Sequence, residues 1–236
     1  TAIRLLQARQ FPQDSGPLAT PVMPADYESP DNLYTLTTYY KGQEILTMLQ
    51  LMLGKQTFKK GCSIYFSEND GKAASIEDFL SAMARASNKD LSQFLLWYQQ
   101  SGTPQLEFEE HYDADTKVYK LKVKQSCPPT PGQSTKKPLL VPIATGLLDK
   151  NGHDIPLQLV GEATPQGTTR TLELTEEEQT FSFVGIEEKP IPSLLRNFSA
   201  PVKITKTPVS VKELIFLLAN DSDPVNRWFA SHQLAK

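Results

Sequence analysis

Two adjacent tyrosines, Tyr39 and Tyr40, are the residues of this sequence best suited to chemistry. They lie in the stretch LYTLTTYYKGQEI, just before a Lys-Gly pair and a run with helical hydrophobic spacing. A phenol that points into a protein needs a hydrogen-bond partner, and in a cleft its O–H can donate to an oxyanion. Which hydroxyl group points inward therefore bears on whether either tyrosine acts in catalysis.

Helical periodicity predicts that Tyr39 is the inward tyrosine. On a regular α-helix it shares a face with Gly42, Leu46 and Leu53, whereas Tyr40 falls on a face with polar residues. A buried tyrosine is commonly a core residue whose hydroxyl bonds a backbone carbonyl. The alternative is a phenol aimed at a cleft, and periodicity alone leaves both interpretations open.

Other catalytic or ligand-binding motifs are absent from the sequence. It contains no G-x-x-x-x-G-K-[ST], G-x-G-x-x-G, G-x-S-x-G or C-x-x-C. His111, His153 and His232 have no second ligand at metal-binding spacing, so we expect surface histidines and no metal site within this chain. Cys62 shares an apolar stripe with Phe58, which predicts a buried thiol and not a nucleophile.

The hydrophobic period changes twice along the chain, which predicts a multi-domain α+β protein. Residues 1–103 have helical spacing, with a capping box at Ser75 and Asp78. Residues 104–205 have the period of strands and predict a β-sandwich. Residues 206–236 contain two short helical patterns, which we expect to begin a helical-repeat domain.

About seven short strands are expected in the sandwich region. Alternation from Leu106 to Val123 around an Asp-Ala-Asp turn predicts a hairpin, and an Asn151-Gly152 turn predicts a second one. The other predicted strand segments are Leu139–Leu148, Ile155–Val160, Thr169–Leu174, Thr180–Val184 and Leu194–Ile204.

Composition limits the classes of function. Of 236 residues, 39% are hydrophobic, which is enough for a buried core, and the net charge of -3 argues against general nucleic-acid binding. The longest apolar run, Leu214 to Ala219, is too short to span a bilayer. Two cysteines far apart favour a reducing compartment, so we expect a cytoplasmic protein without membrane insertion. No signal peptide is visible, and the ends have the pattern of a fragment.

Two longer strings resemble a known family. The string NLYTLTTYYKGQEI, followed by WYQQSGTP at residues 97–104, is similar to the bacterial aminopeptidase N group of zinc metallopeptidases, of the gluzincin type. The similarity runs through essentially the whole chain, including FSAPV at residues 198–202. Two positions depart from the family pattern: Thr20, where histidine is common, and Tyr40, where glutamate is usual.

The resemblance implies the C-terminal helical part of a thermolysin-like catalytic domain, then an Ig-like or fibronectin-like β-sandwich, then the start of a helical domain. It implies a protein that removes N-terminal residues from peptides, in which Tyr39 stabilises the oxyanion and Tyr34 lines the pocket for the first substrate side chain. The family's zinc motif, H-E-x-x-H, is missing, so zinc ligands are expected upstream of Thr1. The chain alone is expected to be inactive and to bind no zinc, and the protein is expected to be a monomer.

Two other interpretations remain. The chain could belong to a non-catalytic sandwich and helix module used for protein interaction. It could also belong to another zinc-dependent gluzincin, such as an epoxide hydrolase relative, with the same tyrosine but a different cleft. The sequence upstream of Thr1 would separate these from an aminopeptidase.

Overall fold

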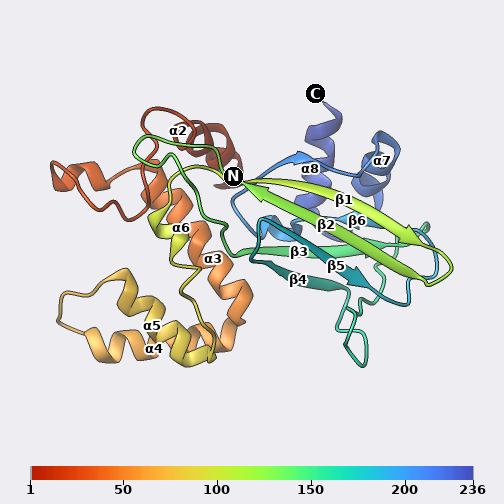
Figure 1. Cartoon of the computed structure of the whole chain (residues 1–236), viewed down its shortest axis with the longest axis horizontal. Coiled ribbons are helices and arrows are strands. Elements are labelled where there is room, and N and C mark those ends of the chain that lie inside the picture. The colour runs from red at the N-terminus through yellow and green to blue at the C-terminus, as the bar shows by residue number, and fades with distance from the viewer. Residues whose placement is uncertain (1, 236) are drawn as a thin grey trace. The chain divides into compact units, whose positions relative to one another are not determined.

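The computed structural model describes residues 2–235, and contacts between residues divide them into two compact units (Figure 1). Unit 1 comprises residues up to Thr103 together with Cys127–Leu140, and unit 2 comprises Pro104–Ser126 with the residues from Val141 onward. The domain boundaries expected from the sequence, at 103/104 and 205/206, stay predictions.

Unit 1 is helical. Its helical elements, in chain order, are α1 (Ala2–Leu5), the π-helical turn η1 (Leu6–Gln10), α2 (Phe11–Gln13), the 3-10 turn η2 (Pro30–Leu33), the π-helical turn η3 (Thr37–Lys41), α3 (Gly42–Leu53), α4 (Lys55–Asn69), α5 (Ile76–Ser87) and α6 (Leu96–Gln99).

Local signals define several of these helices. Gly54 ends α3 with a positive φ of 77°, and the Ser75 side chain accepts a hydrogen bond from the Asp78 amide at the start of α5. The capping box at the start of α5 matches the sequence prediction. The helical spacing after α5 gives only a short helix, because residues 92–95 form a turn and α6 begins at Leu96.

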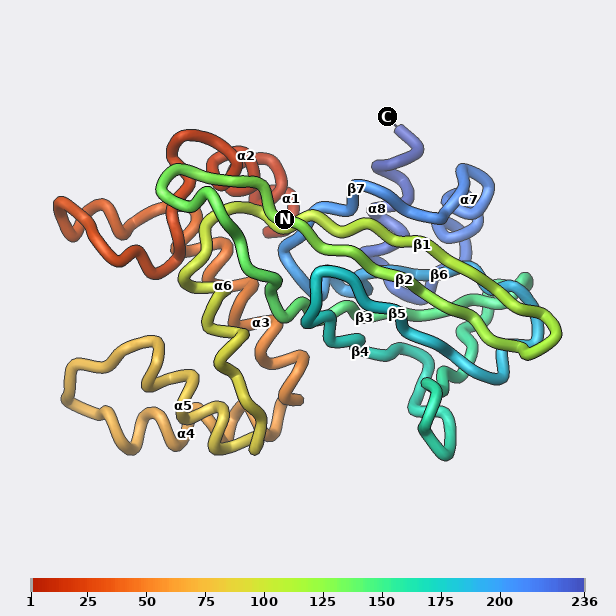
Figure 2. The backbone as a smooth tube through the Cα atoms, in the orientation of Figure 1, coloured from red at the N-terminus to blue at the C-terminus, as the bar shows by residue number. Residues whose placement is uncertain are grey.

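The segment 127–140 belongs to unit 1, although it follows the first two strands in the sequence. Figure 2 shows it as a green tube that returns to the helices. The indole N–H of Trp97 donates to the Leu140 carbonyl at 2.7 Å, and the Gln133 side chain donates to the Gln99 carbonyl at 2.9 Å. Because Trp97 is fully buried, this hydrogen bond fixes the segment against the core of unit 1.

Unit 2 contains two sheets. Their strands are β1 (Gln105–Asp113), β2 (Val118–Ser126), β3 (Val141–Leu148), β4 (Thr169–Leu174), β5 (Glu178–Phe183), β6 (Ile191–Ser193) and β7 (Lys203–Lys206). One sheet has the order β5-β2-β1-β7 and the other β4-β3-β6. β1 and β2 form the expected antiparallel hairpin, in which alternate side chains such as Phe108 and Leu121 are fully buried. Every residue of β3 is buried, so it is the central strand of its sheet.

Two predicted strands are wrong. The segment 155–160 makes only an isolated bridge, between Leu159 and Phe183, and is otherwise irregular. The segment 194–204 is broken by the 3-10 turn η4 (Arg196–Phe198), in which Asn197 and Phe198 have positive φ. Hydrophobic residues at strand spacing predicted burial in both segments. The backbone of neither segment keeps the regular hydrogen-bond pairing of a strand along its length.

Two capped helices close unit 2: α7 (Val211–Asn220) and α8 (Pro224–Leu234). Pro224 occupies the first turn of α8, where its missing N–H costs no helical hydrogen bond. A small apolar cluster joins these helices to the sheet of β3, with Leu148, Leu217 and Ala230 at its centre. Among residues 2–235, no helix is long and apolar enough to cross a lipid bilayer.

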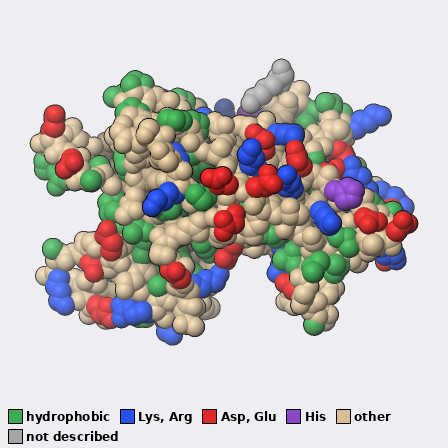
Figure 3. All heavy atoms as spheres, in the orientation of Figure 1, with side chains coloured by type: hydrophobic (Ala, Val, Ile, Leu, Met, Phe, Trp, Pro, Cys, Tyr) green, Lys and Arg blue, Asp and Glu red, His purple; other side chains and the backbone are tan. Residues whose placement is uncertain are grey.

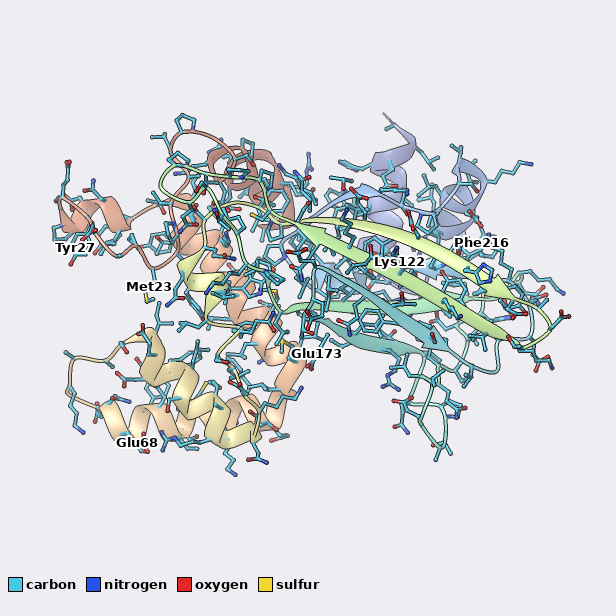
Figure 4. All side chains as sticks on the ribbon, in the orientation of Figure 1. Met23, Tyr27, Glu68, Lys122, Glu173 and Phe216 are labelled. Carbon is cyan, nitrogen blue, oxygen red and sulfur yellow. The ribbon has the colours of Figure 1, made fainter. Side chains whose placement is uncertain are left out.

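The outer face of the four-stranded sheet carries opposite charges side by side, as the blue and red side chains of Figure 3 show. Lys122, labelled in Figure 4, pairs with Glu178 at 2.9 Å, and Lys206 pairs with Glu109 across β7 and β1 at 2.5 Å. The lysines of β2 are therefore part of a mixed, solvated surface and do not form a basic binding face.

Candidate active-site segment

Tyr34 and Tyr39, the two residues singled out by the sequence, lie together on the surface of unit 1. Their ring centroids are 6.4 Å apart with an interplanar angle of 29°, so the rings stack. The exposed fraction is 70% for Tyr34 and 59% for Tyr39. The structure therefore brings the two predicted site residues together, with most of each ring accessible to solvent.

The exposure of Tyr39 corrects the prediction that it points inward. The buried residues of α3 include Ile45, Met48 and Leu49, whereas Leu46, which was expected on the inward face with Tyr39, is exposed. Apolar residues occupy most of the circumference of this helix, so hydrophobicity alone does not select one face.

The backbone around Tyr39 also departs from the α-helical period. The Gly42 amide donates to the carbonyl of Thr37, five residues earlier, in the π-helical turn η3. A helical wheel of 3.6 residues per turn cannot be extended through such a turn. Tyr40, expected on the exposed face, is only half-buried.

Local hydrogen bonds fix the chain just before Tyr39. The Ser29 and Asn32 side chains form a reciprocal capping box around η2, and Tyr34 follows as the C-cap. The Thr35 hydroxyl then accepts a hydrogen bond from the Thr38 amide at 3.1 Å, which begins the next helical stretch. Tyr34 thus lies between two defined turns.

At the end of η3, Lys41 forms a buried ion pair with Asp14 that the sequence analysis did not find. Lys41 Nζ lies 2.9 Å from Asp14 Oδ2, and the side chains are 2% and 0% exposed. Lys41 Nζ also donates to the Gly102 carbonyl at 2.9 Å, while Asp14 Oδ1 accepts from the Gly102 amide at 2.7 Å. Each charge is thus paired and hydrogen-bonded, as burial requires.

The opposite end of η3 is held by Gln10. Its side-chain amide donates to Thr37 Oγ1 at 3.3 Å and to Asp14 Oδ2 at 3.2 Å. Gln10 and Thr37 are both buried. The first and last residues of η3 are therefore bonded, directly or through Asp14, to the same N-terminal helical segment.

Glu44 follows on the buried side of α3. Burial raises the pKa of its carboxyl above the ordinary value of 4.5. Among the described residues, no cluster of three His, Cys, Asp or Glu side chains could hold a metal ion. The three histidines are exposed, as predicted, and Cys62 is half-buried where a buried thiol was expected.

Comparison with known proteins identifies the segment that carries these tyrosines. A protein-family model described as "Peptidase family M1 domain" matches residues 5–98. Residues 5–98 belong to a family M1 domain. An Ig-like domain, described as a domain of unknown function (DUF3458), matches residues 102–207. The predicted order, a catalytic-domain segment followed by an Ig-like sandwich, is thereby confirmed.

Similar proteins include bacterial members of family M1. The chain is 44% identical to aminopeptidase N of Haemophilus influenzae and 40% identical to that of Escherichia coli, over 98% of this chain and 26% of each relative. A crystal structure of Legionella pneumophila aminopeptidase A in complex with aspartic acid is similar with a TM-score of 0.76 and 36% identity, over 88% of this chain and 22% of that chain. The chain thus spans about a quarter of the length of these M1 relatives.

The ion pair that the sequence analysis missed left one signal in the sequence. Lys41 precedes Ile45 by four residues, so it falls on the buried face of the helix, where a lysine needs a partner. No comparable signal marks Asp14, which follows a short helix and precedes a Pro-rich loop. Its role depends on contacts with residues 27 and 88 positions away.

Proposed function

We propose that this chain is part of a longer zinc-dependent aminopeptidase, which hydrolyses the first peptide bond of peptide substrates. Within it, Tyr39 donates its phenolic O–H to the oxyanion that forms when water attacks the scissile carbonyl. Tyr34, stacked on Tyr39, lines the pocket for the first substrate side chain. A non-catalytic interaction module is the other candidate, but the similarity to aminopeptidases favours an enzyme.

One observation carries this proposal: a solvent-accessible pair of tyrosines lies in the segment that belongs to family M1. A phenol bonded inside a core could not reach a substrate, whereas the Tyr39 ring is mostly exposed. Its helix is anchored by buried contacts, so the hydroxyl is held on a rigid element. A donor fixed before the reaction stabilises developing charge without a cost of reorganisation.

The described residues, 2–235, do not fit a catalytic zinc ion. Since no described cluster of potential ligands is present, the proposal places the ligands outside this chain. The chain alone would then bind no catalytic zinc and hydrolyse no aminoacyl substrate. Equilibrium dialysis against zinc and an alanyl reporter peptide test this directly.

We further propose that the complete protein is a cytoplasmic monomer. The two cysteines, Cys62 and Cys127, are free thiols, which suits a reducing compartment. Fractionation of the source cells and sedimentation of the purified protein test the two statements separately.

Tyr39→Phe in the complete protein tests the catalytic role. The substitution keeps the ring and its stacking on Tyr34 but removes the hydroxyl. Loss of one oxyanion donor lowers kcat by about 10²–10³-fold, or roughly 2.7–4 kcal/mol. We expect KM to change little, because the hydrogen bond strengthens only in the transition state.

Tyr40→Phe is the matched control, because it removes the same group one residue away. We expect near-normal kcat in this variant, with zinc content equal in all three proteins. A near-normal kcat in Tyr39→Phe, or a larger loss in Tyr40→Phe, would show that the tyrosine is wrongly assigned.

A further inference from the structure

We propose that Asp14, Lys41 and Gln10 are positioning residues for Tyr39. They hold the π-helical turn η3, and through it they set the direction in which the phenol points. This inference rests on the proposed function, since it assigns a role to residues that act through Tyr39. It concerns the buried contacts beneath the turn and no group that would touch a substrate.

The C-terminal end of the turn is held by charge and geometry together. Lys41 Nζ donates to Asp14 Oδ2 and to the Gly102 carbonyl, each at 2.9 Å. Asp14 in turn accepts from the Gly102 amide at 2.7 Å. With both of these partners buried, the Lys41 side chain cannot rotate without breaking a charge-assisted hydrogen bond.

The N-terminal end of the turn is held by Gln10. Its amide group bridges Thr37 Oγ1 and Asp14 Oδ2, at 3.3 and 3.2 Å. The other side-chain atom, Gln10 Oε1, is buried without a hydrogen-bond partner. An apolar side chain of similar size would avoid that cost, so stability alone does not account for glutamine here.

Tyr39 is the middle residue of the five-residue turn that these contacts hold at both ends. A π-turn contains one residue more than the α-helical path between the same points. If it relaxed to α-helix, Tyr39 would rotate relative to α3 by about 100°, the angle between successive helical residues. Such a rotation would carry the hydroxyl away from its present direction beside Tyr34.

Buried ion pairs are weak evidence for stability, because desolvation opposes their attraction. Replacing both charges together often leaves stability unchanged, whereas removing one leaves an uncompensated buried charge. This difference separates positioning from stability. If the pair only stabilises the fold, its neutral replacement should preserve activity; if it positions Tyr39, the replacement should lower kcat in a folded protein.

The test is the double variant Asp14→Asn with Lys41→Met in the complete protein. Asparagine keeps an acceptor for the Gly102 amide, while both charges and the hydrogen bonds that Asp14 Oδ2 accepts from Lys41 and Gln10 are lost. We expect a urea midpoint close to that of the parent protein, KM within a few-fold, and kcat lower by about 10²-fold, as for displacement of a catalytic group by about 1 Å. A near-normal kcat in the folded double variant would overturn the inference.

Tyr39→Phe added to this double variant shows whether the loss passes through the phenol. If it does, the triple variant should have a kcat close to that of Tyr39→Phe alone, because both changes remove the same interaction. If the triple variant instead loses the product of the two separate fold losses in kcat, that of the double variant and that of Tyr39→Phe, a role through Tyr39 is refuted. A normal kcat for Tyr39→Phe alone would instead refute the proposed function, so the two failures can be told apart.

Two further variants guard against general damage and misfolding. Arg196→Met with Asp154→Asn and Asp221→Asn neutralises another largely buried group of charges, in unit 2, and should leave kcat unchanged. An equal loss there would overturn the inference. Gln10→Met removes the hydrogen bonds to Thr37 and to Asp14 but leaves the Asp14–Lys41 ion pair in place, so this variant tests the inference if the double variant does not fold. We expect a severalfold lower kcat at unchanged stability, and a normal kcat would count against the inference.

Discussion

Gly102 lies where the segment 127–140 packs against the end of the helical chain, and its replacement by alanine tests that packing. Its φ is +95°, a region that residues with a Cβ rarely adopt. A Cβ built there lies 2.8 Å from Cys127 Sγ and 3.3 Å from Thr130 Cγ2. Both neighbours would have to move, although the backbone groups that bond Asp14 and Lys41 remain.

The expected loss is the sum of a backbone and a packing contribution. Positive φ costs a non-glycine residue about 1–2 kcal/mol, and overpacking a filled site costs about 1–3 kcal/mol. Gly102→Ala should therefore lower the free energy of unfolding by about 2–5 kcal/mol. Gly132→Ala is the matched control, because its φ is +73° and nothing lies within 4 Å of the added Cβ. It should lose only the backbone contribution of about 1–2 kcal/mol.

Urea unfolding of the two variants at unchanged m measures both losses. Cys127→Ala combined with Gly102→Ala should be less destabilised than the sum of the single substitutions, because removal of Sγ makes room for the new methyl group. If Gly102→Ala is no worse than Gly132→Ala, or if the two losses add, the close packing is not the cause.

Two further predictions concern the pair of helices α4 and α5. Gly61→Ala would place a Cβ 2.3 Å from Met83 Sδ, so we expect a lower urea midpoint, which Met83→Ala should partly restore. Arg85 hydrogen-bonds Glu68, labelled in Figure 4, and this bond lowers the pKa of that carboxyl below 4.5. Any stabilisation by the pair is thus fully present at pH values above the pKa of Glu68 in the unfolded chain. It is lost as the pH falls through the lower pKa of Glu68 in the folded protein. In Arg85→Ala, NMR titration should show the pKa of Glu68 returning toward 4.5.

Much of the fold follows from local sequence. The Ser75 and Asp78 pair begins a helix because its capping bonds involve residues three positions apart, and Gly54 ends one because it adopts positive φ. The hairpin of β1 and β2 follows from strict alternation of one buried face. The roles proposed for Tyr34 and Tyr39 came only from resemblance to a family, since periodicity gave Tyr39 the wrong direction.

The direction of Tyr39 and the ion pair beneath it were decided only by tertiary structure. Asp14 meets Lys41 and Gly102 across 27 and 88 positions, and no local pattern encodes such contacts. α3 is apolar around most of its surface, so packing selected its buried face, and the π-turn η3 then broke the period needed to place Tyr39. The sequence by itself determined the helices, the hairpin and the order of the domains, because caps, turns and alternation act between near neighbours. The path of the backbone through the site depended on distant partners, because buried charges are stable only where the fold pairs them.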